Sequence, residues 1–87
     1  MPEITLLQLR ELGACADQCA EFEKRFGKSV EVTEELCLSV ADVFNWDWAA
    51  EYLLGAPALA EYKRVMAAAW ADYKRVAAQT FARLFNR

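Results

Sequence analysis

The most consequential absence in this chain of 87 residues is histidine, which does not occur at all. Histidine is the commonest general base in enzymes, the commonest metal ligand and a member of the Ser-His and Cys-His catalytic pairs. The three glycines stand apart at Gly13, Gly27 and Gly55, so the chain has no glycine-rich loop of the kind that holds a phosphate. The sequence therefore does not predict an enzyme, and we expect no catalytic residue and no cofactor.

Cysteine is scarce and forms no recognisable disulfide or metal pattern. Cys15, Cys19 and Cys37 are odd in number and lack the dense spacing of a disulfide-stapled secreted fold. Cys15 and Cys19 share a helical face, but a structural zinc site needs four ligands and only one further thiol remains. Because free cysteine behaves as a small hydrophobe, we expect three buried thiols and no metal.

Long apolar runs are also missing. No stretch approaches the roughly 20 apolar residues that cross a bilayer, and the start, Met1-Pro-Glu-Ile-Thr5, lacks the basic and apolar segments of a signal peptide. A length of 87 residues is close to the size at which one core gives only a modest margin of stability. We expect a soluble intracellular protein made of one domain, residues 1–87.

Charge is divided unevenly along the chain, whose net charge is −3. Residues 1–55 carry eleven acidic and four basic side chains, whereas residues 56–87 carry two acidic and six basic ones. This division favours docking between the two parts or steering of a basic partner, and a merely solvated exterior is the simpler alternative. Two basic pairs in the C-terminal part are too sparse for a nucleic-acid footprint. The acidic residues expected on a partner-binding face are Glu21, Glu31, Glu34, Glu35 and Asp42.

Local signals predict two short helices near the N-terminus. Thr5 and Gln8 have the spacing of a capping box, and Gly13 suits the left-handed turn after a helix over residues 6–12. Residues 28–32 alternate like a strand but have no obvious partner, so we expect a loop there. A second helix is predicted by apolar residues spaced four, three and four apart, namely Cys15, Cys19, Phe22 and Phe26. This helix is expected to end at Gly27.

Two more short helices are predicted before residue 56. Thr33 is a suitable N-cap for a helix that reaches about Phe44, and Asp47 for a helix over residues 48–54. Asp42, Asp47 and Glu51 cluster in sequence, and we interpret them as capping and solubilising groups rather than as a proton-transfer pair. An aromatic cluster, either core or interface, comprises Phe44, Trp46, Trp48 and Tyr52.

The strongest signal is a repeat of eleven residues: Ala56-Pro-Ala-Leu-Ala-Glu-Tyr-Lys-Arg-Val-Met66 is followed by Ala67-Ala-Ala-Trp-Ala-Asp-Tyr-Lys-Arg-Val-Ala77, and a degraded copy follows. Eleven residues make three helical turns at about 3.67 residues per turn, so matched positions return to the same face. The repeat predicts one helix from Pro57 to Phe85, about 43 Å long at 1.5 Å per residue. Its apolar stripe comprises Leu59, Tyr62, Met66, Trp70, Tyr73, Ala77, Phe81 and Leu84.

Such a helix would be longer than the globule that carries it. A compact chain of this length has a radius of gyration of about 12 Å and therefore a diameter of about 30 Å. The overhanging stripe would need cover from a second copy or another protein. The predicted fold class is all-α, with several short helices packed on one long C-terminal helix, and we expect a homodimer. The aromatic and apolar residues expected at an interface are Trp46, Trp70, Phe81, Leu84 and Phe85.

Four segments resemble a group of small proteins from bacteriophages and prophages: Leu9-Arg-Glu-Leu-Gly-Ala-Cys15, Phe26-Gly-Lys-Ser-Val-Glu-Val-Thr33, Phe44-Asn-Trp-Asp-Trp-Ala-Ala50 and Ala56-Pro-Ala-Leu-Ala-Glu-Tyr-Lys-Arg-Val65. Members of this group carry variable numbers of the eleven-residue unit, and the resemblance supplies no established activity and no functional residues. It implies a phage or mobile-element origin and the cytoplasm of a bacterial host cell. Small acidic phage proteins without enzymatic motifs are often inhibitors of host defence, anti-CRISPR proteins among them.

Three functions remain in competition. The first is a non-enzymatic protein-binding module that inhibits a bacterial defence complex, its acidic surface occupying a nucleic-acid-binding groove or a basic subunit surface of the host protein. The alternative is a structural or assembly module that self-associates through the C-terminal helix. The third is a small enzyme that uses Asp47 or Glu51.

Overall fold

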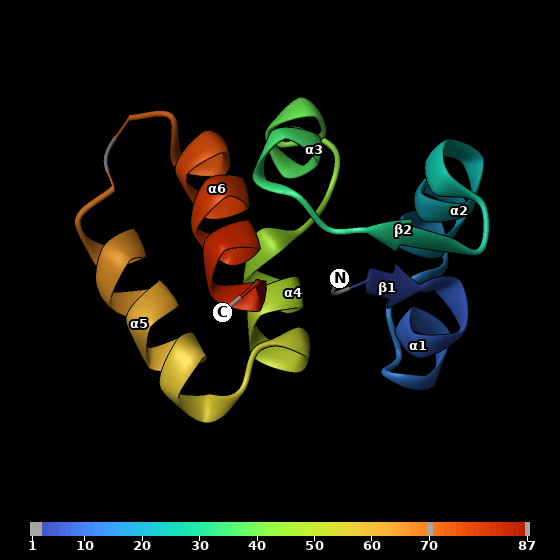
Figure 1. The fold of residues 1–87 in the computed structure, drawn as a ribbon, viewed down its shortest axis with the longest axis horizontal. Coiled ribbons are helices and arrows are strands. Elements are labelled where there is room, and N and C mark those ends of the chain that lie inside the picture. Colours follow the sequence, from blue (N-terminus) through green and yellow to red (C-terminus); the bar gives the residue numbers. More distant parts are fainter. Residues whose placement is uncertain (1–2, 70, 87) are drawn as a thin grey trace. The chain divides into compact units, whose positions relative to one another are not determined.

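The computed structural model of the chain describes residues 3–69 and 71–86. Within these residues it contains six helices and two short strands, in the order β1, α1, α2, β2, α3, α4, α5 and α6 (Figure 1). The mostly helical character is confirmed, but the strands make the fold not purely α. The chain divides into two compact units, Met1–Val32 and Thr33–Arg87. That boundary differs from the predicted one after residue 55, and the organisation as a single domain stays a prediction.

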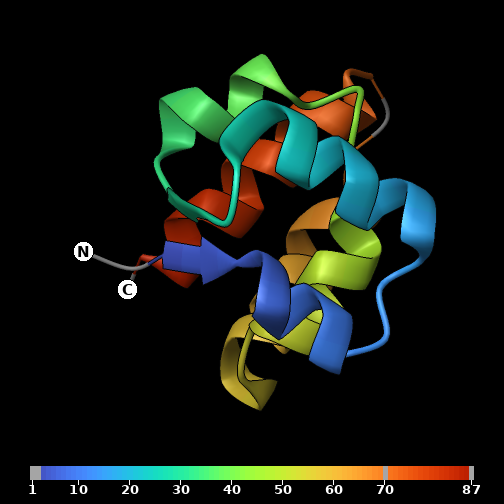
Figure 2. The same cartoon turned by 90° about the vertical axis from the view of Figure 1, so that its right-hand side faces the viewer.

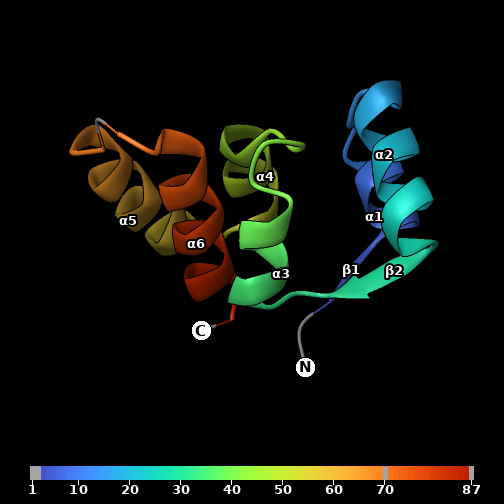
Figure 3. The ribbon, with the colours of Figure 1, turned by 90° about the horizontal axis from the view of Figure 1, so that it is seen from above.

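In the first unit, two helices lie between two short strands along the sequence. Strand β1 (Glu3–Thr5) runs directly into α1 (Leu6–Glu11), as Figure 2 shows. After α2 (Ala16–Phe26), strand β2 (Ser29–Glu31) returns beside β1 (Figures 1 and 3). The pairing is antiparallel, with Ile4 opposite Val30. The prediction of a loop over residues 28–32 is therefore wrong. Its partner strand is only three residues long, too short to show an alternating pattern in the sequence.

The helix ends of the first unit follow the local signals closely. Gln8 N–H donates to Thr5 Oγ1 over 3.0 Å, and the Gln8 side chain accepts from Thr5 N–H, which completes the capping box. After α1, Gly13 has a φ of +84°. The Gly13 N–H donates to the Arg10 carbonyl and the Ala14 N–H to the Leu9 carbonyl, the two hydrogen bonds of a Schellman motif. Both the helix start at Thr5 and its stop at Gly13 are confirmed.

The core of the first unit is small and includes one of its two cysteines. Cys19 is buried and its Sγ lies 3.8 Å from the Ala14 carbonyl oxygen. Cys15, by contrast, is the N-cap residue of α2 and is exposed. The expectation of a buried thiol is thus wrong for Cys15, because the apolar face of α2 begins one turn later. The buried residues of this unit are Ile4, Leu6, Leu9, Cys19, Phe22 and Val32.

The second unit contains α3 (Glu34–Ser39), α4 (Trp46–Leu53), α5 (Ala56–Ala67) and α6 (Tyr73–Phe85). Leu36 N–H donates to Thr33 Oγ1 over 3.1 Å, so the predicted cap at Thr33 is confirmed, although α3 ends earlier than expected. Helix α4 begins two residues before the predicted start. Its cap is Asn45, whose Oδ1 accepts from Trp48 N–H over 3.0 Å, and Asp47 is left free for other contacts.

The predicted single helix over residues 57–85 is two helices. Helix α5 ends at Ala67, α6 begins at Tyr73, and the two run antiparallel side by side (Figure 1). Asp72, immediately before α6, has a φ of +52°, a left-handed conformation that aspartate tolerates better than most residues. Folding back lets the two halves of the apolar stripe pack within the unit, and this burial outweighs the helix propensity of the intervening segment. The overhang that required a partner is not present.

Helix α6 is the centre of the second unit and contacts α3, α4 and α5. Its alanines at 77, 78 and 82 are at most 1% exposed, which allows the neighbouring helices to approach closely. Phe81 is 1% exposed and packs on Trp46, with ring centroids 5.7 Å apart. Trp46 also donates from Nε1 to the Ala41 carbonyl over 2.9 Å. These contacts place Trp46 and Phe81 in the core rather than at a partner surface.

Two other residues expected at an interface also pack within the unit. Leu84 is buried, and Phe85 is half-buried and stacks on Phe81 with ring centroids 5.4 Å apart. The physical reason is the same hairpin, which turns the stripe toward α3 and α4. Trp70, the remaining member of that expected set, lies outside the described residues.

Candidate interaction surface

The predicted acidic face is divided between the two units. Glu21 and Glu31 belong to the first, and Glu34, Glu35 and Asp42 to the second. Counted over the structural units, the first has six acidic and four basic residues, and the second has seven acidic and six basic residues. The strong charge division seen at residue 55 therefore does not correspond to a division between folded units.

Two of these five carboxylates already have partners inside the chain. Glu21 Oε2 lies 2.7 Å from Arg25 Nε, and this hydrogen bond lowers the pKa of Glu21. Glu34 accepts from Gln79 Nε2 over 2.6 Å and from Arg83 Nη2 over 3.1 Å, which tethers the start of α3 to α6. The bond from Gln79, followed by that from Arg83, lowers the pKa of Glu34. Glu31, Glu35 and Asp42 are exposed.

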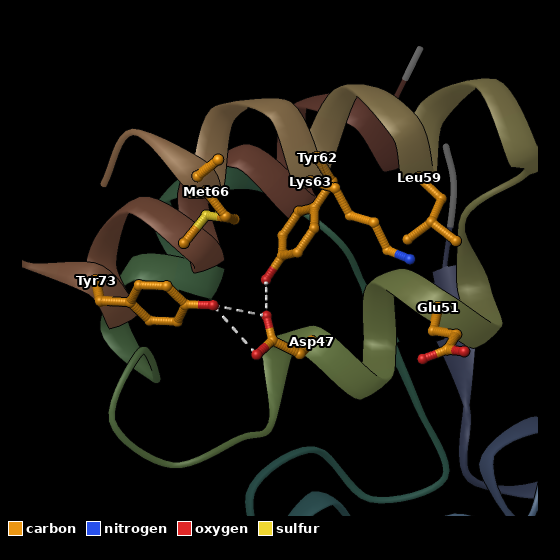
Figure 4. A pocket seen from close by; sticks show the side chains of 8 residues that line it. Asp47, Glu51, Leu59, Tyr62, Lys63, Met66 and Tyr73 are labelled. Atoms are coloured by element: carbon orange, nitrogen blue, oxygen red, sulfur yellow. Dashed lines mark hydrogen bonds between the residues drawn. The ribbon is translucent and has the colours of Figure 1, made fainter. Parts of the chain in front are cut away.

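A hollow in the second unit brings together residues that the sequence does not connect. It has a volume of about 340 Å³ and lies among α4, α5 and the start of α6 (Figure 4). At its base Asp47 Oδ1 accepts from Tyr62 Oη over 2.9 Å and from Tyr73 Oη over 3.0 Å. The Tyr73 hydroxyl also lies 3.2 Å from Asp47 Oδ2. The hollow is lined by Asp47, Glu51, Leu59, Tyr62, Lys63, Met66, Ala67 and Tyr73.

The two tyrosines occupy matched positions of the eleven-residue repeat. In one continuous helix they would lie about 16 Å apart along the axis. The turn between α5 and α6 instead brings both hydroxyls to the same carboxylate oxygen. The repeat thus supplies one tyrosine from each helix, and Asp47 on α4 holds both. One signal in the sequence could have indicated this site: two tyrosine hydroxyls lie on an apolar stripe, and a buried tyrosine usually needs a polar partner.

Burial and the carboxylate act on the tyrosines in the same direction. Tyr62 is 3% exposed and Tyr73 is 42% exposed. In both cases burial is the main cause that raises the hydroxyl pKa, and the hydrogen bond to Asp47 raises it further. Both hydroxyls therefore remain protonated at neutral pH and can donate to Asp47.

Helix α4 carries two adjacent rows of side chains. Trp48 and Tyr52 are four residues apart, with ring centroids 4.8 Å apart and planes inclined by 31°. Asp47 and Glu51, each one residue earlier, are exposed and form the second row. Tyr52 is 50% exposed. We call Asp47, Trp48, Glu51 and Tyr52 the α4 surface; the aromatic cluster of the sequence is thus split between the core at Trp46 and this surface.

Other chemistry is sparse in the part of the chain that the structure describes. No group of three or more cysteine and acidic side chains there is arranged to hold a metal ion. Burial raises the pKa of the Cys37 thiol to about 11, so it is protonated at neutral pH. None of the described helices has the length and apolar character needed to span a bilayer.

Comparisons of the chain with protein-family models, with curated proteins and with solved structures gave no match. The chemistry of the hollow and the α4 surface is therefore the basis on which a function is proposed. Exposed carboxylates beside ordered aromatic rings are suited to contact with a basic surface.

Proposed function

We propose that this chain is a non-enzymatic protein-binding module that contacts its partner through the α4 surface. The observation that carries the proposal is the exposed Tyr52 ring, which packs against Trp48 beside two exposed carboxylates. Tyrosine and tryptophan are enriched among the residues that contribute most to binding at protein interfaces. Because the two rings already support each other, little side-chain freedom is lost when a partner covers them.

The charge of this surface indicates the chemistry of the partner. Among the described residues the ion pairs are Arg25–Glu21, Arg64–Glu61 and Arg83–Glu34, and none of them involves Asp47 or Glu51. Two carboxylates outside these ion pairs steer a positively charged protein surface toward α4 and disfavour nucleic acid. We propose a basic protein partner.

The sharper form of the proposal is an inhibitor of a bacterial defence complex, of phage or mobile-element origin and acting like an anti-CRISPR protein. Its support is the resemblance of the repeat and three other segments to small phage proteins, together with an acidic surface that suits a basic, nucleic-acid-binding groove of a host complex. Self-association through the C-terminal helix has less support, because Phe81 and Leu84 are buried within the unit.

Affinity purification from a bacterial lysate tests the proposal with three baits: the unchanged chain, Tyr52→Ala and Leu7→Ala. Leu7 is 66% exposed in the first unit and serves as the matched control for an exposed apolar side chain. We expect one host protein to bind the unchanged chain and Leu7→Ala, and to bind Tyr52→Ala about 30-fold more weakly, as for a hot-spot residue worth about 2 kcal/mol.

The bound protein should also be released as the salt concentration rises, because surface charges are screened. Equal recovery with Tyr52→Ala and the unchanged chain would contradict the proposed surface. Recovery of further copies of this chain alone, checked by sedimentation, would favour the assembly module instead.

A further inference from the structure

The hollow beside the α4 surface has the size of a small ligand site. Its volume of about 340 Å³ lies at the low end of the range of about 300–1,000 Å³ that ligand pockets occupy. Carboxylates of Asp47 and Glu51 stand on the α4 side, and the rings of Tyr62 and Tyr73 come from α5 and α6 (Figure 4). Such a combination of anionic and aromatic walls suits a flat cation better than a neutral or anionic group.

The carboxylates keep hydrogen-bonding capacity for that cation. A carboxylate has about four acceptor positions. The two tyrosine hydroxyls occupy mainly Oδ1 of Asp47, and only the longer contact from Tyr73 reaches Oδ2. The Glu51 side chain has no hydrogen bond or ion pair to any other residue that the structure describes. One turn of α4 separates the two acids, and both line the hollow: Asp47 lies at the end next to Tyr73 and Glu51 at the end next to Leu59 (Figure 4).

The tyrosines also prepare Asp47 for binding. Both hydroxyls hold the carboxylate at a fixed place in the hollow, so an incoming donor finds it already oriented. Lys63 extends from α5 toward the end of the hollow where Glu51 lies (Figure 4), but its amine makes no ion pair with either acid. Lys63 therefore leaves both acids unpaired, although its positive charge competes with an incoming cation for them.

We infer that this hollow receives the guanidinium group of an arginine on the partner protein. A guanidinium carries five donors in a planar fork, pairs with carboxylates in two-point contacts and stacks on aromatic rings, whereas a lysine ammonium is a compact, strongly hydrated charge. The inference rests on the proposed function: Trp48 and Tyr52 cover the surface of the partner, and its arginine enters beside them.

The binding test uses small probes on the full chain. Nα-acetylarginine amide is titrated while NMR follows the ring protons of Tyr62 and Tyr73 and the backbone amides of α4. The lysine derivative and the citrulline derivative, which is the uncharged isostere of arginine, are titrated in parallel. We expect saturable shifts with arginine, at least threefold weaker binding of lysine and no saturable shift with citrulline. Arginine shifts that do not saturate, or that citrulline reproduces, would overturn the inference.

Two substitutions locate the site. Glu51→Gln removes a charge without touching the tyrosine hydrogen bonds and should weaken arginine binding at least fivefold. Glu35→Gln removes an exposed charge from α3, outside the hollow, and should leave the affinity unchanged. Lys63→Met should strengthen binding because the competing amine is gone. Equal weakening by the glutamine variants at 51 and 35 would show general charge attraction and would also overturn the inference.

The failures of the two proposals are distinguishable. If a host protein is retained through Tyr52 but arginine does not bind, the guanidinium site is wrong and the protein-binding module stands. If arginine binds in the hollow but Tyr52→Ala retains every host protein, the α4 surface is wrong as the main contact.

Discussion

At the scale of residues, Asp47 has the largest structural consequence. Its carboxylate is the common acceptor for hydroxyls from two different helices. The sequence predicted Asp47 to be a helix cap, because capping is a local property that a short window reveals. Asn45 takes that role, and the true partners of Asp47 lie 15 and 26 residues away. Local signals such as the Thr5–Gln8 capping box and Gly13 were predictable because both members of each interaction are close in sequence.

Asp47→Asn should lower the free energy of unfolding by about 1–2 kcal/mol, because the amide accepts the tyrosine hydrogen bonds without the assistance of a full charge. In urea titrations the double variant with Tyr62→Phe should lose less than the two single losses combined, since both changes act on the same hydrogen bond, one by weakening it and the other by removing it. Asp42→Asn, at an exposed acid outside this network, should stay within about 0.5 kcal/mol of the unchanged chain. Equal stability of the Asp47 and Asp42 variants would contradict the role of Asp47.

The raised pKa of the Cys37 thiol leads us to expect that the stability of the fold changes at alkaline pH. Burial raises its pKa from about 9 to about 11, so above pH 9 the unfolded thiol ionises while the folded one stays protonated. The folded state then binds more protons, and the free energy of unfolding falls between pH 9 and 11 by up to about 2–3 kcal/mol from this group. The raised pKa values of Tyr62 and Tyr73 act in the same direction at higher pH.

Cys37→Ala should therefore flatten the fall in stability between pH 9 and 11, whatever its effect at neutral pH. Cys15→Ala, at the exposed thiol, is the control and should keep the slope of the unchanged chain. Denaturant unfolding at a series of pH values measures both slopes. Identical slopes for Cys37→Ala and the unchanged chain would show that the buried thiol has an ordinary pKa.

At the scale of elements, the eleven-residue repeat predicted helix and helix phase but not the break between α5 and α6. A continuous helix and a helical hairpin place matched positions on equivalent faces, so the period alone does not distinguish them. No glycine or proline marks the break, and alanine favours a helix. Only Asp72, a residue that tolerates positive φ, offered a local signal. Burial favours the hairpin over the continuous helix, because the small alanines at 77, 78 and 82 let α6 pack at the centre of its unit.

Glycine substitutions at matched repeat positions measure that break. Ala60 lies inside α5 and Ala71 lies between the helices, and both are exposed. Ala60→Gly should cost about 1 kcal/mol of unfolding free energy, the usual penalty inside a helix, whereas Ala71→Gly should cost much less. Urea unfolding compares the two. Equal costs would indicate that residue 71 is helical and that α5 and α6 are one helix.

At the scale of the whole molecule, the chain divides into two compact units. The sequence predicted a division at residue 55 from charge, whereas the folded division falls between Val32 and Thr33. Charge reports the composition of a segment but not which segments pack together. The contact between Glu34 and Arg83 illustrates this, because it joins the acidic and basic parts of the sequence inside one unit.

Residues 33–87 should fold without the first unit, because α3 to α6 bury their own core around Phe81. We expect this fragment to keep a helical circular dichroism spectrum and a cooperative thermal transition. A fragment of residues 56–87 lacks Trp46 and Asp47 and should not unfold cooperatively. Residues 1–32 should be unfolded alone, since chains below about 40 residues usually need a disulfide, a metal or a partner. An unstructured 33–87 fragment would show that the second unit depends on the first.

The central feature of the molecule is the α5–α6 hairpin, which brings the two repeat tyrosines to Asp47 and so builds the hollow. Nuclear Overhauser spectroscopy on the full chain tests this feature most directly. We expect a cross-peak between the ring protons of Tyr62 and those of Tyr73, because the hydroxyls of both rings donate to the same carboxylate oxygen of Asp47. We also expect the cross-peaks that join successive helical turns to be interrupted between Ala67 and Tyr73. An uninterrupted helical pattern through these residues, with no cross-peak between the two rings, would contradict the hairpin.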